Sequence, residues 1–214
     1  MTIQKKIIGE FLGTLFLLTV VVGSGIMGDN LSGGNAAIAL LANSFATGLG
    51  LSVLILVFGS ISGGEFNPLV TFANFIHGLH QKNESIFYFI AQLAGAIVGV
   101  FVAHAMFGQN YFDISNHARS GLGQVFSEYI ATFGLIMVIR GTEKSKLPFA
   151  VGAYIGSAYW FTASTSFANP VVTLARALTP SFAGIRPSDT IGFIVAQILG
   201  AVTAEFLFLW LKKD

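Results

Sequence analysis

The sequence contains no cysteine, and charged residues make up only 10% of its 214 positions. The absence of cysteine excludes disulfides, thiolate nucleophiles and cysteine-ligated metal or iron–sulfur centres. The shortage of charge excludes an ordinary soluble domain, because 54% of the residues are hydrophobic and a soluble chain of this length could not bury them. The net charge of +1 gives no indication of a nucleic-acid partner. We therefore expect an integral membrane protein that contacts the lipid bilayer directly.

Long apolar segments dominate the sequence instead. Six of them, each about 18 to 23 residues long, are long enough to cross the hydrocarbon core as helices, which predicts an all-α membrane domain spanning residues 1–214. The first follows a basic start, but it is too long for the apolar region of a signal peptide, so we interpret it as a transmembrane helix. Two further stretches, residues 59–80 and 166–185, break the apolar pattern with glycine, proline and polar residues. The six segments are residues 7–27, 36–58, 85–107, 124–140, 147–165 and 190–211.

The lysines and arginines are distributed unevenly between the two sides of these segments. Only Arg119 and Arg186 fall clearly on one side. By the positive-inside rule the richer side is cytoplasmic, and both termini belong to it. The basic residues of the richer side are Lys5, Lys6, Lys82, Arg140, Lys144, Lys146, Lys212 and Lys213.

The chain repeats itself in three places, in the same order. "FNPLVTFA", which contains Asn67, matches "ANPVVTLA", which contains Asn169, at an offset of 102 residues; "GEFLGT" matches "SEYIAT", and "AQLAGAIVG" matches "AQILGAVTA". Each copy therefore holds three spans and one interrupted stretch, and the copies cover roughly residues 1–112 and 113–214. Because three crossings are an odd number, the second copy enters the membrane from the opposite face, as in the inverted repeats of many channels and transporters.

The two interrupted stretches each contain a signal for the start of a helix. Asparagine is a strong N-cap and proline is favoured at the first helical position, so Asn67-Pro68 and Asn169-Pro170 predict helix starts. A helix from Pro68 to about Gly78 would be roughly 15 Å long, half of a hydrocarbon core of about 30 Å. Irregular backbone at that depth is tolerated where it is buried in protein or lines a water-filled cavity. We therefore expect two half-helices that meet at the centre beside a pore.

The expected pore favours uncharged solutes. Each half-helix directs its positive end, roughly half an elementary charge, to the centre, and the two ends together repel cations and protons. The side chains of Asn67 and Asn169 supply donors to a passing oxygen atom. No ring of acidic residues is present to coordinate cations, so small hydroxyl-bearing solutes are the best-suited cargo.

These motifs resemble those of the major intrinsic protein family, the aquaporins and aquaglyceroporins, over essentially the whole chain. The resemblance rests on "EFLGT", "SGGEFNPLVT", "AQLAGA", "SEYIAT", "FANPVVT" and "AQILGA". It implies a passive channel of six transmembrane helices plus two half-helices, and a homotetramer with one pore per subunit. The stretch "FANPVVTLARALTPSFAGI" also resembles bacterial aquaglyceroporin-like channels associated with arsenic-resistance gene clusters. That second resemblance implies a bacterial inner membrane, and metalloid hydroxides such as arsenite, or glycerol and urea, as cargo.

Several residues depart from the pattern that the family implies for its pore. Leu69 and Val171 replace the usual alanine after Asn-Pro, and they either reshape the central constriction or pack beneath the two asparagines. Val172 stands where water-selective members carry an arginine that narrows the outer filter. The resemblance implies a filter that is small, mildly polar and uncharged, and hence a wide pore. Its members are Thr47, Ser157, Ser166 and Val172.

Four acidic residues, Glu10, Glu65, Glu128 and Glu205, lie in or near apolar segments, where a charge invites a functional interpretation such as proton coupling. The resemblance implies that Glu10 and Glu128 support the half-helix loops through backbone hydrogen bonds. Glu65 stands beside the inner pore mouth where many members carry histidine, so a gating or pH role is one interpretation. Arg176 either faces the outer vestibule and attracts oxyanions, or anchors loop carbonyls or lipid headgroups.

The sequence offers nothing that points to catalysis or to a cofactor. The histidines have no metal-ligand spacing, no phosphate-binding loop is present, and no nucleophile, base and orienting group converge. Three alternatives to a wide solute channel remain open. They are a water-selective channel, a secondary transporter built from inverted repeats, and a non-conducting membrane protein whose centre Leu69 and Val171 occlude.

Overall fold

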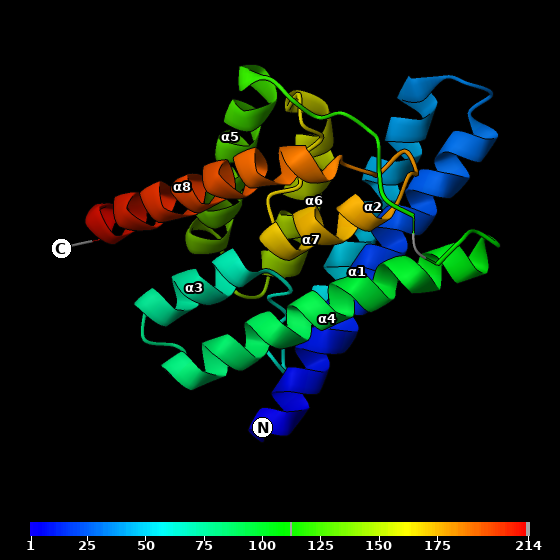
Figure 1. The fold of residues 1–214 in the computed structure, drawn as a ribbon. Coiled ribbons are helices and arrows are strands. Elements are labelled where there is room, and N and C mark those ends of the chain that lie inside the picture. The colour runs from blue at the N-terminus through cyan, green and yellow to red at the C-terminus, as the bar shows by residue number, and fades with distance from the viewer. Residues whose placement is uncertain (112, 213–214) are drawn as a thin grey trace.

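The computed structural model describes residues 1–111 and 113–212, so Lys213 lies outside it. Over these residues the chain forms eight α-helices and one short 3₁₀ helix, and no strand (Figure 1). The predicted all-α membrane fold is confirmed. The elements are α1 (Ile3–Leu31), α2 (Ala36–Phe58), α3 (Pro68–Ile76), α4 (Lys82–Met106), α5 (Leu122–Gly141), α6 (Leu147–Phe161), α7 (Pro170–Ala175), η1 (Arg176–Leu178) and α8 (Pro187–Leu211).

Helix α6 is shorter than the sequence predicted. The apolar segment was expected to stay helical to residue 165, but α6 has 15 residues and ends at Phe161. The backbone of Thr162 is extended, with φ −108° and ψ 139°, and the left-handed φ angles of Thr165 and Ser166, 64° and 50°, keep the helix from resuming before residue 166. The chain therefore leaves the helix early. Within the described residues, the helices long and apolar enough to cross a membrane are α1, α2, α4, α5 and α8.

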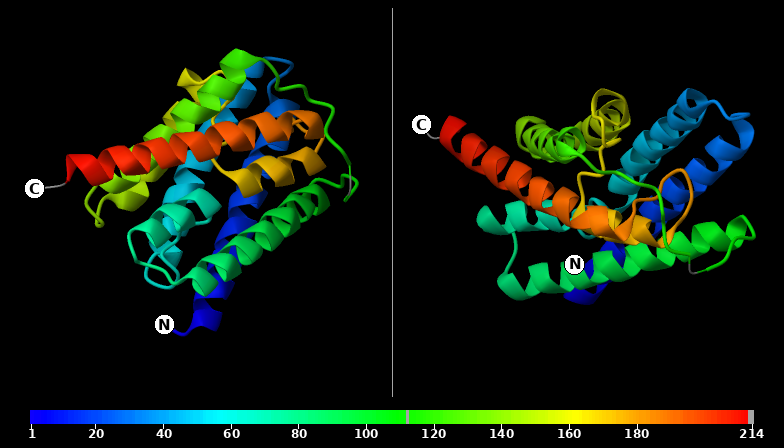
Figure 2. Two further views of the ribbon diagram at one scale, coloured as in Figure 1. Left: turned by 60° about the vertical axis from the view of Figure 1, so that its left-hand side comes forward. Right: turned by 45° about the horizontal axis from the view of Figure 1, so that its top comes forward.

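The two half-helices lie inside the bundle formed by the long helices. Helix α1 packs against α2 and α4, α5 packs against α8 and α6, and α2 packs against α6. Helices α3 and α7 each contact α4 and α8, and they also contact one another (Figures 1 and 2). The pairing of α1 with α4 is thus matched by the pairing of α5 with α8, and the short helices meet between these pairs.

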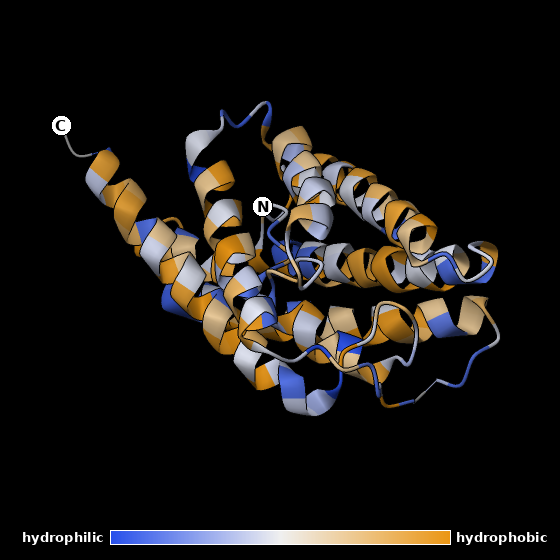
Figure 3. Cartoon of the chain, turned by 90° about the horizontal axis from the view of Figure 1, so that it is seen from above, coloured by the Kyte–Doolittle hydropathy of each residue, from blue (hydrophilic) through white to orange (hydrophobic). Residues whose placement is uncertain are grey.

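The outer surface of the bundle is apolar along the helices. Figure 3 shows hydrophobic residues along most helical faces and hydrophilic residues concentrated in connections and at helix ends. On α2, for example, the side chains of Phe45, Leu49 and Val53 are exposed at a spacing of four residues, which places them on one outward face. A face of this kind suits hydrocarbon rather than water.

Close helix contact depends on glycine at the repeated "AQLAGA" and "AQILGA" segments. A Cβ atom at Gly95 of α4 would lie 2.3 Å from the carbonyl oxygen of Phe11 on α1, and one at Gly200 of α8 would lie 2.4 Å from that of Tyr129 on α5. No real Cβ atom approaches a backbone oxygen so closely. Glycine at both positions lets the two backbones touch, as small residues do at many membrane helix interfaces.

We expect Gly200→Ala to destabilise the protein. The added methyl group must push α8 away from α5, and overpacking of this kind costs about 1–3 kcal/mol. The measurement is thermal unfolding in detergent, followed by tryptophan fluorescence. Gly123→Ala is the matched control, because Gly123 also lies in a helix and a Cβ atom there meets nothing within 4 Å. Equal unfolding midpoints for the two variants would contradict the close-packing role of Gly200.

Candidate functional site

The two asparagines of the Asn-Pro segments start the half-helices and also tie them together. The side-chain oxygen of Asn67 accepts the N–H of Leu69 at 3.0 Å, and that of Asn169 accepts the N–H of Val171 at 3.1 Å. Each side-chain amide then donates across the centre. Asn67 Nδ2 donates to the carbonyl oxygen of Ala168, and Asn169 Nδ2 donates to that of Phe66, both at 2.8 Å. The starts of α3 and α7 are therefore locked to each other.

The carbonyl groups that accept these bonds belong to residues in a strained conformation. Phe66 and Ala168 each have a φ angle of 50°, in the left-handed region that costs a non-glycine residue about 1–3 kcal/mol. Both residues directly precede an asparagine, so the strain occurs at equivalent places in the two repeats. Such strain persists only when surrounding contacts over-determine it.

Two buried carboxylates supply those contacts. Glu10 accepts the N–H of Phe66 at 2.7 Å, and Glu128 accepts the N–H of Ala168 at 2.9 Å. Glu10 also accepts the N–H of Glu65 at 3.1 Å, and Glu128 also accepts that of Phe167 at 2.9 Å. Each carboxylate thus holds two successive backbone donors of one half-helix loop, which keeps the strained turn in place.

Two glutamines complete this support, and sequence reasoning missed them. Gln92 donates to Glu10 at 2.8 Å and lies 3.1 Å from Thr71 Oγ1, while Gln197 donates to Glu128 at 2.6 Å and lies 2.8 Å from Thr173 Oγ1. Both glutamines belong to the repeated "AQ" segments, which served in the sequence analysis only as evidence of the internal repeat and of the family resemblance. The signal was available, because a glutamine that recurs at equivalent places in two apolar helices needs a buried partner.

A cavity of about 460 Å³ runs past the two asparagines. Its wall comes from one face of each surrounding helix, at a spacing of four residues. On α2 this face carries Thr47, Leu51 and Ile55, and on α6 it carries Val151, Ile155 and Tyr159. At one end the lining includes His80, Arg140 and Lys144, and at the other Ser166, Val172 and Arg176. The lining is mostly apolar, with hydroxyl, amide and charged groups at particular levels.

Three of the four expected filter residues line this cavity, and Ser157 does not. Thr47, Ser166 and Val172 are buried on its wall, whereas Ser157 is exposed. Ser157 lies two positions from both Ile155 and Tyr159, and two residues turn a helix by about 200°, so it faces away from the pore. The expected placement of Ser157 is therefore wrong. Tyr159 takes its place, and its hydroxyl donates to Thr47 Oγ1 at 3.3 Å.

Leu69 and Val171 lie off the cavity. Both side chains are buried in the hydrophobic core, and neither they nor Pro68 and Pro170 are part of the lining. The following residues, Val70 and Val172, face the cavity instead. Of the two interpretations that the sequence left open, packing beneath the asparagines is therefore the one that the geometry favours.

Arg176 is buried at one end of the cavity. Its side chain is 1% exposed and lines the cavity, and its Nε donates to the carbonyl oxygen of Ala183. The guanidinium carbon lies 3.4 Å from the centroid of the Phe167 ring, which adds a cation–π contact. Arg176 therefore anchors a loop carbonyl and faces the cavity at the same time.

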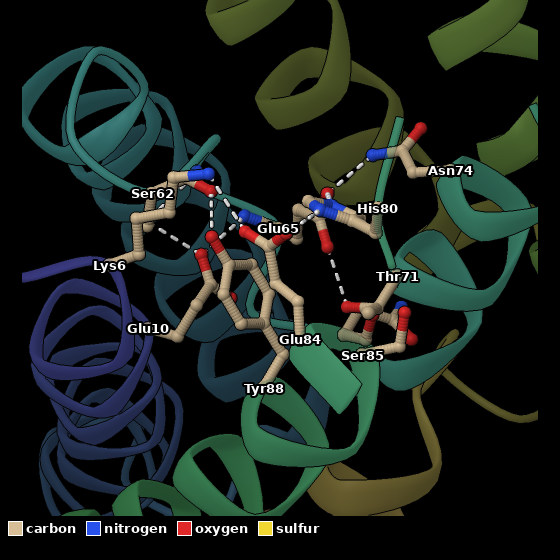
Figure 4. Close-up of polar contacts among 12 residues, drawn as sticks. Lys6, Glu10, Ser62, Glu65, Thr71, Asn74, His80, Glu84, Ser85 and Tyr88 are labelled. Carbon is tan, nitrogen blue, oxygen red and sulfur yellow. Dashed lines mark hydrogen bonds and ion pairs between the residues drawn. The ribbon is translucent and has the colours of Figure 1, made fainter. Parts of the chain in front are cut away.

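Glu65 is held in a network at the opposite end, beside α3 (Figure 4). Its carboxylate accepts a hydrogen bond from Thr71 Oγ1 at 2.6 Å, lies 2.6 Å from His80 Nε2, and accepts a further bond from Asn74. Asn74 in turn accepts a bond from Arg140 Nη1 at 3.0 Å. Glu65 thus connects the loop before α3 to the loop after it. Among the described residues, no group of acidic and histidine side chains is arranged to hold a metal ion.

The Glu65–His80 contact predicts that stability depends on pH. The hydrogen bond that His80 donates to Glu65 raises the pKa of His80 above its ordinary value of 6.5, and the charges of Glu65 and Glu84 add to this although burial opposes it. Lys6 pairs with Glu84, and the Tyr88 ring packs on His80. A raised pKa means that protonated His80 stabilises the fold fully below about pH 6.5 and loses this effect as pH rises through the folded-state pKa.

We therefore expect the unfolding midpoint of the native chain to fall as pH rises above about 6.5, and to fall less in His80→Gln. The measurement is thermal unfolding in detergent over a pH series. Lys82→Gln, at an exposed position on the same side of the molecule, is the control for loss of a basic side chain. Parallel curves for the native chain and His80→Gln would contradict the role of this pair.

The half-helices α3 and α7 meet inside a bundle of membrane-length helices. A cavity lined by residues of several helices runs past their starts, and this arrangement is that of a membrane channel. The chain belongs to the major intrinsic protein family, whose model matches residues 1–153. Members of this family are channels and not enzymes, and the chain is accordingly a passive channel for small solutes in a membrane.

Comparisons with individual proteins agree with this assignment. The chain is 46% identical over 214 residues to the aquaglyceroporin AqpS of Rhizobium meliloti (strain 1021), covering 99% of this chain and 91% of that protein. It is 31% identical to aquaporin A of Dictyostelium discoideum, over 98% of this chain and 79% of that protein. The structure of the aquaglyceroporin from Plasmodium falciparum has the same fold, with a TM-score of 0.78, 22% identity, and 97% and 96% of the two chains covered.

Proposed function

We propose that the channel conducts small uncharged solutes through a widened outer filter, with metalloid hydroxides such as arsenite, glycerol, urea and water as cargo. The observation that carries this proposal is Val172, which lines the cavity at the position where water-selective members of the family carry arginine. A valine leaves more room there than an arginine. The high identity to a protein named aquaglyceroporin supports a solute larger than water.

The lining chemistry supports the same cargo. Leu51 and Ile55 give the wall an apolar stripe, and Thr47 and Tyr159 place two hydroxyl groups beside it. A polyol presents carbon atoms on one side and hydroxyl groups on the other, so such a wall can replace its hydration shell without charge. Uncharged trihydroxides offer the same kind of oxygen atoms.

The contacts of Leu69, Val171 and the buried glutamates argue against two alternatives, a non-conducting protein and a secondary transporter. A non-conducting protein was considered because Leu69 and Val171 could occlude the centre, but both pack in the core. A secondary transporter would need a carboxylate free to bind a coupling ion, whereas Glu10 and Glu128 are occupied by backbone donors. Passive conduction needs neither an occluding side chain nor a free carboxylate.

We further propose one channel domain over residues 1–214, with inverted repeats of roughly residues 1–112 and 113–214, assembled as a homotetramer. Both termini would be cytoplasmic in a bacterial inner membrane. On the proposed inner side, Lys212 Nζ donates to the backbone carbonyl oxygen of Arg140 at 2.7 Å, which links the residue after α8 to the end of α5. On the proposed outer side, Asp189 accepts the backbone N–H of Arg119 and a hydrogen bond from the guanidinium of Arg186, both at 2.9 Å. Native mass spectrometry tests the tetramer.

The test of cargo is stopped-flow measurement on proteoliposomes with separate gradients of water, glycerol and arsenite. We expect fast solute flux that rises linearly with concentration and is unaffected by a proton gradient. Water flux without solute flux would favour the water-selective alternative. Saturable flux that requires a proton gradient would favour a transporter, and no flux of any kind would contradict the proposal.

A further inference from the structure

Two buried polar atoms at the outer end of the cavity have no hydrogen-bond partner in the described part of the chain. They are Arg176 Nη1 and Ser166 Oγ, and both residues line the cavity. Buried donors are almost always satisfied in folded proteins, so two unsatisfied donors on one cavity wall need an explanation. A permeating solute that offers acceptor oxygens would satisfy both.

We propose that Arg176 and Ser166 form a binding site for the oxygen atoms of the solute, and that this site makes the channel prefer solutes with two or more neighbouring hydroxyl oxygens. Polyols and trihydroxides belong to this class, and urea, with its single acceptor oxygen, does not. The inference rests on the proposed conduction of uncharged solutes. The outer pore thus contains an arginine side chain although position 172 is valine, because Arg176, four residues further along the chain, reaches the cavity.

The guanidinium of Arg176 is held in place before any solute arrives. Its Nε is fixed to the Ala183 carbonyl, the Phe167 ring packs against its face, and its backbone carbonyl accepts the N–H of Ile185 at 3.2 Å. These contacts leave the two N–H groups of Nη1 free. A donor pair that is already oriented binds an acceptor without the entropic cost of ordering a long side chain.

Arg119 shows that such free donors are not the rule for buried arginines in this protein. Its Nε donates to Gly184 at 2.7 Å, and its Nη1 and Nη2 donate to the carbonyl groups of Ser164 and Phe182. All three of its nitrogen atoms are thus used to fix the outer loops. Arg119 therefore helps to hold these loops with all three nitrogen atoms, whereas Nη1 of Arg176 has no protein partner among the described residues and lies at the cavity.

The first repeat lacks an equivalent charge. At the offset of 102 residues that relates the asparagines, the counterpart of Arg176 is Asn74, which is uncharged and accepts a bond from Arg140. The charge of Arg140 is paired with Glu205 at 3.0 Å, whereas no ion pair involves Arg176 within the described residues. At the opposite end Arg140 Nη2 is also buried without a hydrogen-bond partner among the described residues, but the charge of that guanidinium is offset by Glu205. Arg176 is thus the buried guanidinium on the cavity wall that has no ion pair among the described residues, and donors carrying full charge form the stronger hydrogen bonds.

Ser166 completes the site from the loop before α7. Its N–H donates to Ser164 Oγ at 3.2 Å and its φ angle of 50° turns it out of the regular backbone, while its hydroxyl remains unpartnered. Tyr159, which interacts with Arg176, and Thr47 place further hydroxyl groups on the same cavity wall. A solute with several hydroxyl groups can engage more than one of these donors together.

The test compares the ratio of glycerol to urea flux in proteoliposomes carrying the native chain, Ser166→Ala and Arg176→Lys. Ser166→Ala removes an unpartnered hydroxyl, and Arg176→Lys keeps the charge but removes the forked donors. We expect the ratio to fall about threefold in Ser166→Ala and about tenfold in Arg176→Lys, as expected for loss of one neutral and one charged hydrogen bond. Arg186→Lys and Ser188→Ala, at exposed positions of the proposed outer side, are the matched controls and should keep the native ratio.

Unchanged or increased ratios in both variants, with native unfolding midpoints, would overturn the site while leaving the proposed function intact. If Arg176→Lys fails to fold, Ser166→Ala alone decides, because its hydroxyl holds no other residue in place. Absence of glycerol and urea flux in the native chain would instead contradict the proposed function. Boric acid, which carries three hydroxyl groups, serves as a second probe and should follow glycerol rather than urea.

Discussion

Replacing Glu128 with alanine is expected to abolish the folded channel at ordinary temperature. The substitution leaves the N–H groups of Phe167 and Ala168 without an acceptor inside the protein, and it removes one of the two hydrogen-bond partners of Gln197. Each buried donor left unsatisfied costs about 1–3 kcal/mol, so the two orphaned backbone donors together cost several kcal/mol, a large share of a typical stability. The strained turn at Ala168 would relax, and Asn169 would no longer face the cavity.

The measurement is the unfolding midpoint in detergent together with solute flux in proteoliposomes. Glu143→Ala is the matched control, because Glu143 is exposed and pairs only with Lys146 at the surface. The equivalent substitution in the first repeat, Glu10→Ala, should behave like Glu128→Ala, since Glu10 holds the same kind of turn. If the Glu128→Ala variant had the same unfolding midpoint as the native chain and still conducted solutes, the carboxylate would not be what holds the loop.

The features predicted well from the sequence are those with local causes. The half-helix starts follow from the N-cap preference of Asn67 and Asn169 and from the fixed φ angle of the prolines that follow them, and neither depends on distant residues. The spans follow from length and apolar content. The internal repeat then relates the two halves without any knowledge of side-chain contacts.

The residues of α6 that line the pore could not be assigned from the sequence. Ser157 was chosen by counting along the family pattern, whereas a helix shows its residues to a cavity at intervals of three or four. The spacing of Val151, Ile155 and Tyr159 repeats that of Thr47, Leu51 and Ile55 on α2. Ala153, Ser157 and Phe161 have the same spacing on the other face of α6, so the choice between the two faces required the packed structure.

The surroundings of Arg176 could not have been predicted in the same way. The hydrogen bond from Arg176 to Ala183 requires the loop after η1 to fold back. The contact of Arg176 with Phe167 joins the segment after α7 to the segment before it. Both contacts depend on the path of irregular segments, and hydrophobic periodicity does not predict that path. The same is true of Glu65, whose partners Asn74 and His80 lie at the far end of α3 and in the loop beyond it.

Replacing Val172 with arginine is expected to reduce glycerol and arsenite flux strongly while water flux falls much less. Val172 lies on the cavity wall, buried and one helical turn before Arg176. An arginine there fills part of the cavity and adds a second positive charge one helical turn from Arg176. A loss of solute flux of about tenfold corresponds to an added barrier of about 1.4 kcal/mol, a modest cost for narrowing a pore around a molecule of several heavy atoms.

Val172→Leu separates size from charge in this prediction, because leucine enlarges the side chain without adding a donor. Stopped-flow measurements of water and glycerol on the same vesicles give the two fluxes for each variant. If narrowing alone matters, Val172→Leu lowers glycerol flux in proportion to its added volume and Val172→Arg lowers it further. If water and glycerol flux fall equally in Val172→Arg, position 172 does not discriminate between them, and the wide-filter assignment of Thr47, Tyr159, Ser166 and Val172 fails.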